Sequence, residues 1–289
     1  MKFDFTPTKD FLIGIDSDGC VFDTMELKQK ECFTPNTIRF WGLQGVSKYA
    51  REACDFVNLY SKSRGINRFL SLIEELDWLA RRPEVKARGV KIDVPQSLRD
   101  WVKRETKLGN PALTAEVERT DDPGLRKTLE WSLAINDFVD MIVGSGVPPF
   151  PCVRESLEKM RGKADILVVS ATPQDALVRE WEEQDLIRHV AAICGQEIGT
   201  KKESLVLAAK YPKNRTLMIG DAPGDHKAAL ANDALFYPIN PGDEERSWQR
   251  LGEEGLERFF AGTFAGEYQN RLVEEFNAHL PATPPWKTE

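Results

Sequence analysis

The sequence has few of the residues that build a disulfide scaffold or a zinc site. Its five cysteines are scattered, odd in number and without a CxxC pair, so we expect reduced thiols. The three histidines, His189, His226 and His279, lie far apart and lack the spacing of zinc ligands. This cysteine usage favours a reducing compartment, and we expect a cytoplasmic protein.

Long hydrophobic runs and an excess of positive charge are also missing. No apolar run approaches the roughly 18 residues that a membrane span requires, and the N-terminus shows no secretory signal. The net charge of −7 argues against general nucleic-acid binding, although it is compatible with a local basic pocket. We therefore expect neither a membrane nor a nucleic acid as a partner. A chain of 289 residues can bury a sizeable core in one or two domains.

Two aspartates directly follow a short apolar segment near the N-terminus. Residues 11–15 read F-L-I-G-I and predict a buried strand, after which D-S-D-G places Asp16 and Asp18 at its carboxyl end. In open α/β sheets, ligands bind at this edge. Two carboxylates that are buried there repel one another and require a metal, a proton or a basic partner. The alternative interpretation is an ordinary turn, because Asp, Ser and Gly are common turn residues.

The rest of the chain divides into a helical part and an α/β part. Residues 25–148 show only helical patterns, and the breaker cluster G-S-G-V-P-P-F-P at 144–151 predicts a hinge. After it, apolar strands alternate with helices, which indicates a mostly parallel sheet covered on both faces. We predict a Rossmann-like α/β core formed by residues 1–24 and 149–289, with an all-helical domain inserted at 25–148.

Three further predicted strand ends carry polar residues. Ser170 follows I-L-V-V, Lys201 begins a helix after Gly199-Thr200, and Asp221 and Asp225 lie in M-I-G-D-A-P-G-D. Because the carboxyl ends of parallel strands meet at one edge of a sheet, these side chains are expected to lie near Asp16 and Asp18. They would supply the metal ligand, the hydroxyl donor and the cation that two crowded carboxylates require.

These motifs in this order resemble the haloacid dehalogenase superfamily. That family has D-x-D-G after the first strand, then Ser, Lys and G-D-x-x-x-D at later strand ends, and this sequence is similar to its phosphatase branch. The helical insert falls where one class of the family's cap domains is inserted. The resemblance implies the haloacid dehalogenase fold, a phosphoric monoester hydrolase activity and Mg²⁺ as the cofactor.

The resemblance also implies a role for each motif residue. Asp16 would be the nucleophile that forms an aspartyl-phosphate, and Asp18 would be the general acid and base, a role that requires a raised pKa. Mg²⁺ would be bound by the Asp16 and Asp221 carboxylates and the backbone carbonyl of Asp18. Asp225 would orient a metal-bound water or pair with the lysine.

The resemblance further implies that a hydroxyl group, an ammonium group and backbone N–H groups would hold the phosphate of the substrate. Ser170 would donate a hydrogen bond, and the Lys201 ammonium would neutralise the phosphate, with Lys202 as the alternative lysine. Backbone N–H groups are expected to be further donors, at Ser17, Asp18 and Ala171. We expect Thr172 to be only a helix N-cap before Pro173, with Asp175 three residues later.

The helical insert would then be a cap that selects a small phosphate ester. Its best specificity candidates are Arg64 and Arg68 in S-K-S-R-G-I-N-R at 61–68, since arginine forks suit carboxylates and phosphates. A solvated turn between two helices is an equally good interpretation of this segment. Two alternatives to the phosphatase remain: a phosphomutase of the same superfamily, and a non-catalytic binding or regulatory module on this scaffold.

Overall fold

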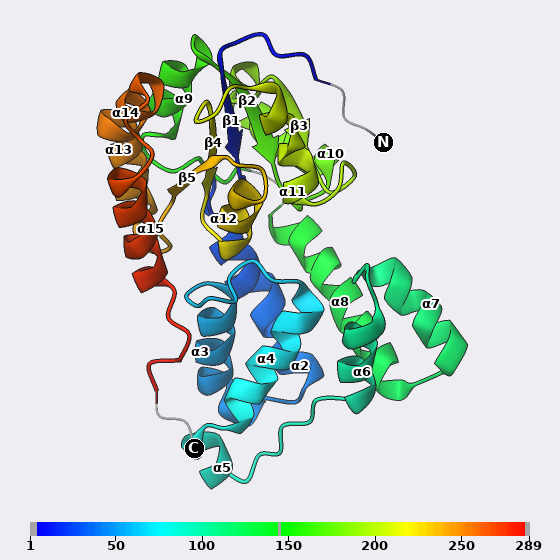
Figure 1. Ribbon diagram of the computed structural model, residues 1–289. Coiled ribbons are helices and arrows are strands. Elements are labelled where there is room, and N and C mark those ends of the chain that lie inside the picture. Colours follow the sequence, from blue (N-terminus) through cyan, green and yellow to red (C-terminus); the bar gives the residue numbers. More distant parts are fainter. Residues whose placement is uncertain (1–4, 144–145, 287–289) are drawn as a thin grey trace. The chain divides into compact units, whose positions relative to one another are not determined.

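The computed structural model describes residues 5–143 and 146–286 and divides the chain into two compact units (Figure 1). The α/β unit consists of Met1–Met25 and Ser145–Leu280, and the helical unit consists of Glu26–Gly144 and Pro281–Glu289. The sequence-based division placed everything after residue 148 in the α/β core, so the segment after Leu280 is the main difference. The first two residues of the expected hinge, Gly144 and Ser145, lie outside the described residues.

The α/β unit is built on a five-stranded sheet in which each strand is parallel to its neighbours. In the order β3-β2-β1-β4-β5, its strands are β3 (Ala192–Cys194), β2 (Ala164–Val169), β1 (Phe11–Ile15), β4 (Thr216–Gly220) and β5 (Leu235–Pro238). β1 is central and entirely buried, as its continuous apolar sequence predicts. The prediction of a parallel α/β sheet with a helical insertion between the first two strands is confirmed.

Helices cover both faces of this sheet. Alternate residues of β1 point to opposite faces, so they belong to different cores. Ile13 and Ile15 belong to a core with α9, α10, α13 and α14, whereas Leu12 belongs to a core with η4 and α12; α15 contributes to both. The helices of this unit, with shorter η segments, are α9 (Val153–Arg161), α10 (Gln174–Glu183), η3 (Ile187–His189), α11 (Lys201–Ser204), η4 (Leu205–Lys210), α12 (Pro223–Leu230), α13 (Glu244–Arg250), η5 (Leu251–Gly255), α14 (Leu256–Ala261) and α15 (Glu267–His279).

The helical unit has its own core, in which aromatic rings pack edge to face. The Phe69 ring lies 5.1 Å from that of Trp101 and 6.4 Å from that of Trp131, measured between centroids. Its elements, beginning at the boundary between the units, are α1 (Thr24–Leu27), η1 (Lys28–Phe33), α2 (Thr34–Phe40), η2 (Gln44–Val46), α3 (Ser47–Asn58), α4 (Arg68–Ala80), α5 (Pro83–Ala87), α6 (Gln96–Arg104), α7 (Asn110–Thr120) and α8 (Pro123–Ile142). Among the described residues, no helix combines the length and the apolar character needed to cross a membrane.

The C-terminal segment packs on the helical unit through Trp286. The Arg82 guanidinium lies between two rings, 4.4 Å from the Trp286 centroid and 4.6 Å from that of Tyr49. The Phe56 ring meets Trp286 edge to face at 5.6 Å, and the Lys62 N–H donates to the Pro281 carbonyl. Leu280 belongs to the α/β core. The chain therefore passes from the α/β unit into the helical unit a second time, between Leu280 and Pro281.

We expect Trp286→Ala to destabilise the helical unit. A buried tryptophan contributes about 3–5 kcal/mol, and a half-buried ring such as Trp286 should contribute about 1–2 kcal/mol. Differential scanning fluorimetry should therefore show a Tm that is lower by about 2–6 °C. Trp286→Phe, which keeps a ring against Arg82, is the matched control and should retain most of the stability. An equal Tm for Trp286→Ala and the unchanged chain would mean that the Trp286 ring does not stabilise the helical unit.

Candidate functional site

Three buried polar residues lie where the central strands end. Ile15 of β1 pairs with Val168 of β2 and with Ile219 of β4, so the three strands end at the same level. Asp16 directly follows β1, Ser170 follows β2 and Asp221 follows β4, and each is at most 4% exposed. The structure therefore brings together at one edge of the sheet the residues that the sequence placed there.

The carboxylates at this edge form a group that can hold a divalent cation. One oxygen from each of Asp16, Asp221 and Asp225 lies within 4.8 Å of the others, and all three residues are buried. Mg²⁺ prefers hard oxygen ligands, and buried carboxylates at this spacing are the donor set it binds in proteins. The residues thus fit the cofactor that the motifs imply.

Lys201 lies among the same carboxylates. Its Nζ donates to Asp16 Oδ2 and, at 2.7 Å, to Asp225 Oδ1. The backbone places it there: Thr200 is the N-cap of α11 and forms a capping box with Glu203, which fixes Lys201 as the first helical residue. Lys202, the alternative lysine, is exposed. Of the two neighbouring lysines, Lys201 is therefore the one whose ammonium contacts the aspartate cluster.

Asp225 is fully buried, and both of its oxygens are engaged by the protein. Oδ1 accepts from Lys201, and Oδ2 accepts from the Ala222 N–H at 3.0 Å. Gly220 leaves room for this side chain, since a Cβ on Gly220 would lie only 2.4 Å from Asp225 Cγ. This geometry suits the predicted pairing of Asp225 with the lysine.

Burial and mutual repulsion perturb the protonation of this cluster. Burial raises the pKa of Asp16 to about 7; the Lys201 ammonium acts to lower that pKa, and the Asp225 carboxylate acts to raise it further. Burial also raises the pKa of Asp225, against the opposing effect of Lys201. Burial alone would lower the pKa of Lys201, but the carboxylates of Asp16, Asp225 and Asp221 together raise it, so the lysine stays charged. The site is therefore short of positive charge, which favours binding of a cation.

Asp18 is held by two threonine hydroxyls. Thr24 Oγ1 donates to Asp18 Oδ1, and Thr172 Oγ1 donates to Asp18 Oδ2 at 2.6 Å. The expectation that Thr172 is only a helix cap was wrong: the N-cap of α10 is Pro173, and the N–H of the first helical residue, Gln174, donates to Glu197 Oε2 at 3.0 Å. The sequence offered one indication of this contact: Thr172 lies two residues after Ser170, at the same strand end.

Ser17 has hydrogen-bond partners that the sequence did not predict. Its backbone N–H, expected to face phosphate, donates to Asp16 Oδ1 at 2.8 Å. The buried hydroxyl donates to Glu180 Oε2 at 3.1 Å and accepts from the Trp181 indole N–H at 3.0 Å. Ala171, the other expected neighbour of phosphate, is an exposed residue in the turn after Ser170. The contacts of Ser17 tie the turn after β1 to α10 and fix the orientation of Asp16.

The two arginines proposed for specificity have contacts within the helical unit. Arg68 Nη1 donates to the carbonyl and hydroxyl oxygens of Ser132 and to Asn136 Oδ1 at 2.8–3.1 Å. Arg64 is buried, and its Nη1 donates to the Leu59 carbonyl at 2.9 Å. Both side chains thus stabilise this unit, and their role in substrate specificity stays a prediction.

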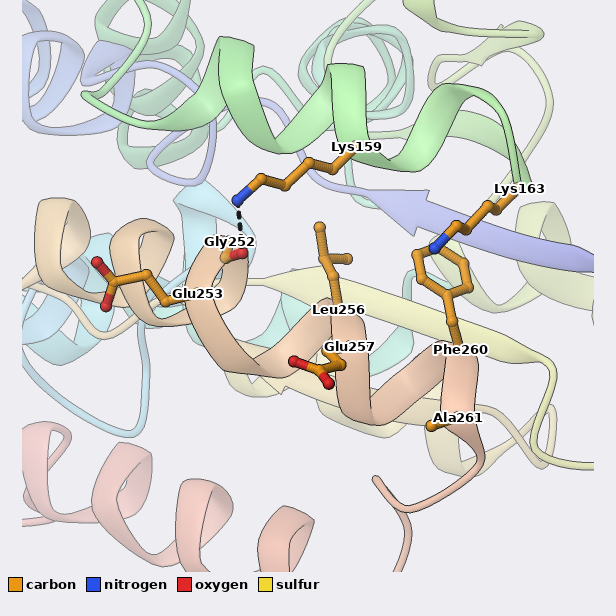
Figure 2. Close-up of a pocket in the computed structure, with 8 residues that line it drawn as sticks. All are labelled: Lys159, Lys163, Gly252, Glu253, Leu256, Glu257, Phe260 and Ala261. Carbon is orange, nitrogen blue, oxygen red and sulfur yellow. Dashed lines mark hydrogen bonds between the residues drawn. The ribbon is translucent and has the colours of Figure 1, made fainter.

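A hollow of about 610 Å³ lies in the α/β unit between α9 and the segment formed by η5 and α14 (Figure 2). Its two lysines already have partners: Lys159 Nζ donates to the Gly252 carbonyl at 2.8 Å, and Lys163 Nζ lies 4.8 Å from the Phe260 ring centroid. Glu253 and Glu257 lie on its other wall. None of the predicted site residues lines this hollow, so it is separate from the strand-end cluster.

No family model matches the sequence, and no curated protein matches it either. Solved structures do resemble the chain. A haloacid dehalogenase-like hydrolase from Streptococcus pneumoniae is 11% identical over 83% of this chain and 90% of its own, with a TM-score of 0.49. A subfamily IA hydrolase of the same superfamily from Geobacter sulfurreducens is 14% identical over 80% and 88%, with a TM-score of 0.41. A predicted phosphatase from Clostridium acetobutylicum is 14% identical over 86% and 99%, with a TM-score of 0.43.

The sheet and the insertion define the class of fold. The chain has a parallel five-stranded sheet with β1 at its centre, helices inserted between β1 and β2, and acidic residues after β1 and β4. The predicted fold class, a parallel α/β sheet with a helical insertion between its first two strands, is confirmed, and the haloacid dehalogenase superfamily is the family whose ordered motifs the sequence resembles.

Proposed function

We propose that the protein is a Mg²⁺-dependent phosphatase that hydrolyses a small phosphate monoester through a covalent intermediate on Asp16. The observation that carries the proposal is the placement of Lys201 on Asp16 within a buried group of three carboxylates. A nucleophilic carboxylate and a phosphate dianion repel one another, and fixed positive charge beside the nucleophile offsets that repulsion. The Lys201 ammonium is charge of this kind.

Asp16 and Asp18 carry the bond-making and proton-transfer steps of the reaction. Asp16 attacks phosphorus, an oxygen–phosphorus bond forms on its carboxylate, and the bond to the alcohol breaks. Asp18 gives a proton to the leaving alkoxide and then takes one from the water that hydrolyses the acylphosphate. Ser170 and Lys201 hold the phosphate oxygens. Asp16, Asp221 and the Asp18 carbonyl would hold Mg²⁺, which would supply further positive charge at the phosphate.

The helical unit is assigned the role of a cap that selects the substrate. Support comes from its place in the chain, between β1 and β2, and from its separate core. A cap of this size favours a small ester over a phosphoprotein, because a bulky substrate could not enter a site that closes. Exclusion of water from such a site would also raise the strength of its electrostatic contacts.

Release of inorganic phosphate from a panel of metabolite monoesters tests the proposal. We expect turnover with Mg²⁺ on at least one small ester and a loss of at least about 100-fold when EDTA removes the metal. Equal rates with and without EDTA would contradict the assigned cofactor. No turnover on any ester would contradict the phosphatase, and an isomerised product without free phosphate would indicate a mutase.

A further inference from the structure

Asp18 is fixed on both of its oxygens by side chains from different segments. Thr24, the first residue of α1, is fully buried and donates to Oδ1. Thr172, in the turn between β2 and α10, donates to Oδ2 at 2.6 Å. The terminal torsion of an aspartate is broad when nothing constrains it. Two hydroxyl donors on opposite oxygens remove this freedom and leave the carboxylate in one orientation.

Thr172 is itself held on both sides of its backbone. Its N–H donates to Ser170 Oγ at 3.2 Å, and its carbonyl accepts from the Gln196 N–H at 3.0 Å. A β-branched side chain also has few rotamers, so fixing the backbone fixes the hydroxyl. Thr172 thereby links the serine assigned to phosphate with the aspartate assigned to proton transfer.

We propose that Thr172 and Thr24 are positioning residues that orient the Asp18 carboxylate for proton transfer to the leaving group. The inference rests on the proposed function, because it requires Asp18 to be the general acid. A general acid must lie within about 2.6–3.2 Å of the atom it protonates. A displacement of about 1 Å in such a group can lower the rate by about 100-fold.

The leaving-group dependence of the first step tests this role, and alcohol release in a single turnover measures that step apart from hydrolysis of the acylphosphate, in which Asp18 acts as the base. Hydrolysis of 4-nitrophenyl phosphate needs little help from an acid, because its leaving phenolate is stable, whereas an alkyl ester such as glycerol phosphate needs the proton. Thr172→Val should lower the single-turnover rate of alcohol release about 10- to 100-fold on the alkyl ester, a share of the factor of about 10²–10⁴ that general acids supply. We expect only a small change on the aryl ester and a nearly constant KM on both.

Conservative variants separate positioning from packing. Thr172→Ser keeps the hydroxyl and should recover most of the activity on the alkyl ester, and Thr24→Val should show the same leaving-group dependence as Thr172→Val. Equal losses on both esters, or no rescue by serine, would overturn the inference. Since Thr172 is only half-buried, its variants are expected to fold, and circular dichroism checks this.

Asp18→Asn distinguishes failure of the inference from failure of the mechanism. Asp18→Asn should slow alcohol release from the alkyl ester much more than from the aryl ester. Thr172→Val added to it should not slow release from the alkyl ester further. If Asp18→Asn slowed single-turnover alcohol release equally on both esters, the acid role of Asp18 and the inference would both be wrong. If Asp18→Asn discriminated and the threonine variants did not, the inference alone would be wrong.

Discussion

Asp16→Asn should reduce phosphate release by about 10³- to 10⁶-fold, the loss typical of removing a catalytic nucleophile. Asparagine keeps the size of the side chain and an acceptor for the Ser17 N–H, but its amide does not attack phosphorus. The change also removes one of the three carboxylates of the buried cluster, and one of the two that are assigned to Mg²⁺. The measurement is free phosphate released from the best ester of the panel, with saturating Mg²⁺. Turnover close to that of the unchanged chain would eliminate Asp16 as the nucleophile.

The same variant is expected to fold at least as well as the unchanged chain when metal is absent. Burial raises the pKa of Asp16 to about 7, above its value of about 4 in an unfolded chain. The folded state therefore binds more protons between these values, and its stability falls as the pH rises from about 4 to about 7. The asparagine side chain does not titrate in this range, so the Tm of the variant in EDTA should fall less over it. If the Tm of Asp16→Asn at pH 8 were far below that of the unchanged chain, unfolding would explain the lost activity.

Asp165→Asn is the matched control, because it changes another buried aspartate of the same sheet. Asp165 lies near the start of β2, where it accepts from the Thr8 N–H at 2.8 Å, the Lys9 N–H at 3.0 Å and the Tyr211 hydroxyl at 2.7 Å. Burial acts to raise its pKa, but these donors together lower it. We expect this variant to melt at a lower temperature and to keep its turnover per folded molecule, the opposite of Asp16→Asn.

The fold was predictable because its signals are local. Continuous apolar runs such as residues 216–220 mark buried strands, and the change from helical to alternating patterns near residue 150 marks the insertion. The strand-end residues followed from topology, since parallel strands bring their carboxyl ends to one edge. Asp16, Ser170 and Asp221 could therefore be placed without any knowledge of their contacts.

Side-chain direction and tertiary contacts could not be predicted in the same way. Thr172 followed by Pro173 has the sequence of a helix cap, and only the approach of Asp18 from another segment decides where its hydroxyl points. The segment before Trp286 has no periodicity, so its sequence does not specify which unit it packs against. That choice depends on Phe56 and Arg82, which lie more than 200 residues earlier in the chain.

Lys201→Met should lower kcat/KM by about 10²- to 10⁴-fold, because it removes a fixed cation beside the nucleophile. Methionine fills a similar volume without charge, so the change isolates the ammonium. Lys202→Met is the matched control on the adjacent, exposed residue, where substitutions typically change stability by less than about 0.5 kcal/mol. Equal activity of the two variants would remove Lys201 from the mechanism.

Stability gives this variant a second and independent readout. Lys201 donates to both Asp16 and Asp225, and breaking a buried ion pair on one side typically destabilises by about 3–5 kcal/mol. Without the ammonium, the pKa values of both aspartates should rise further, so the loss of stability should be small near pH 5 and large near pH 8. Because Mg²⁺ can replace the missing charge, it should raise the Tm of Lys201→Met more than that of Lys202→Met. An equal effect of Mg²⁺ on both variants would mean that the lysine and the metal do not share these carboxylates.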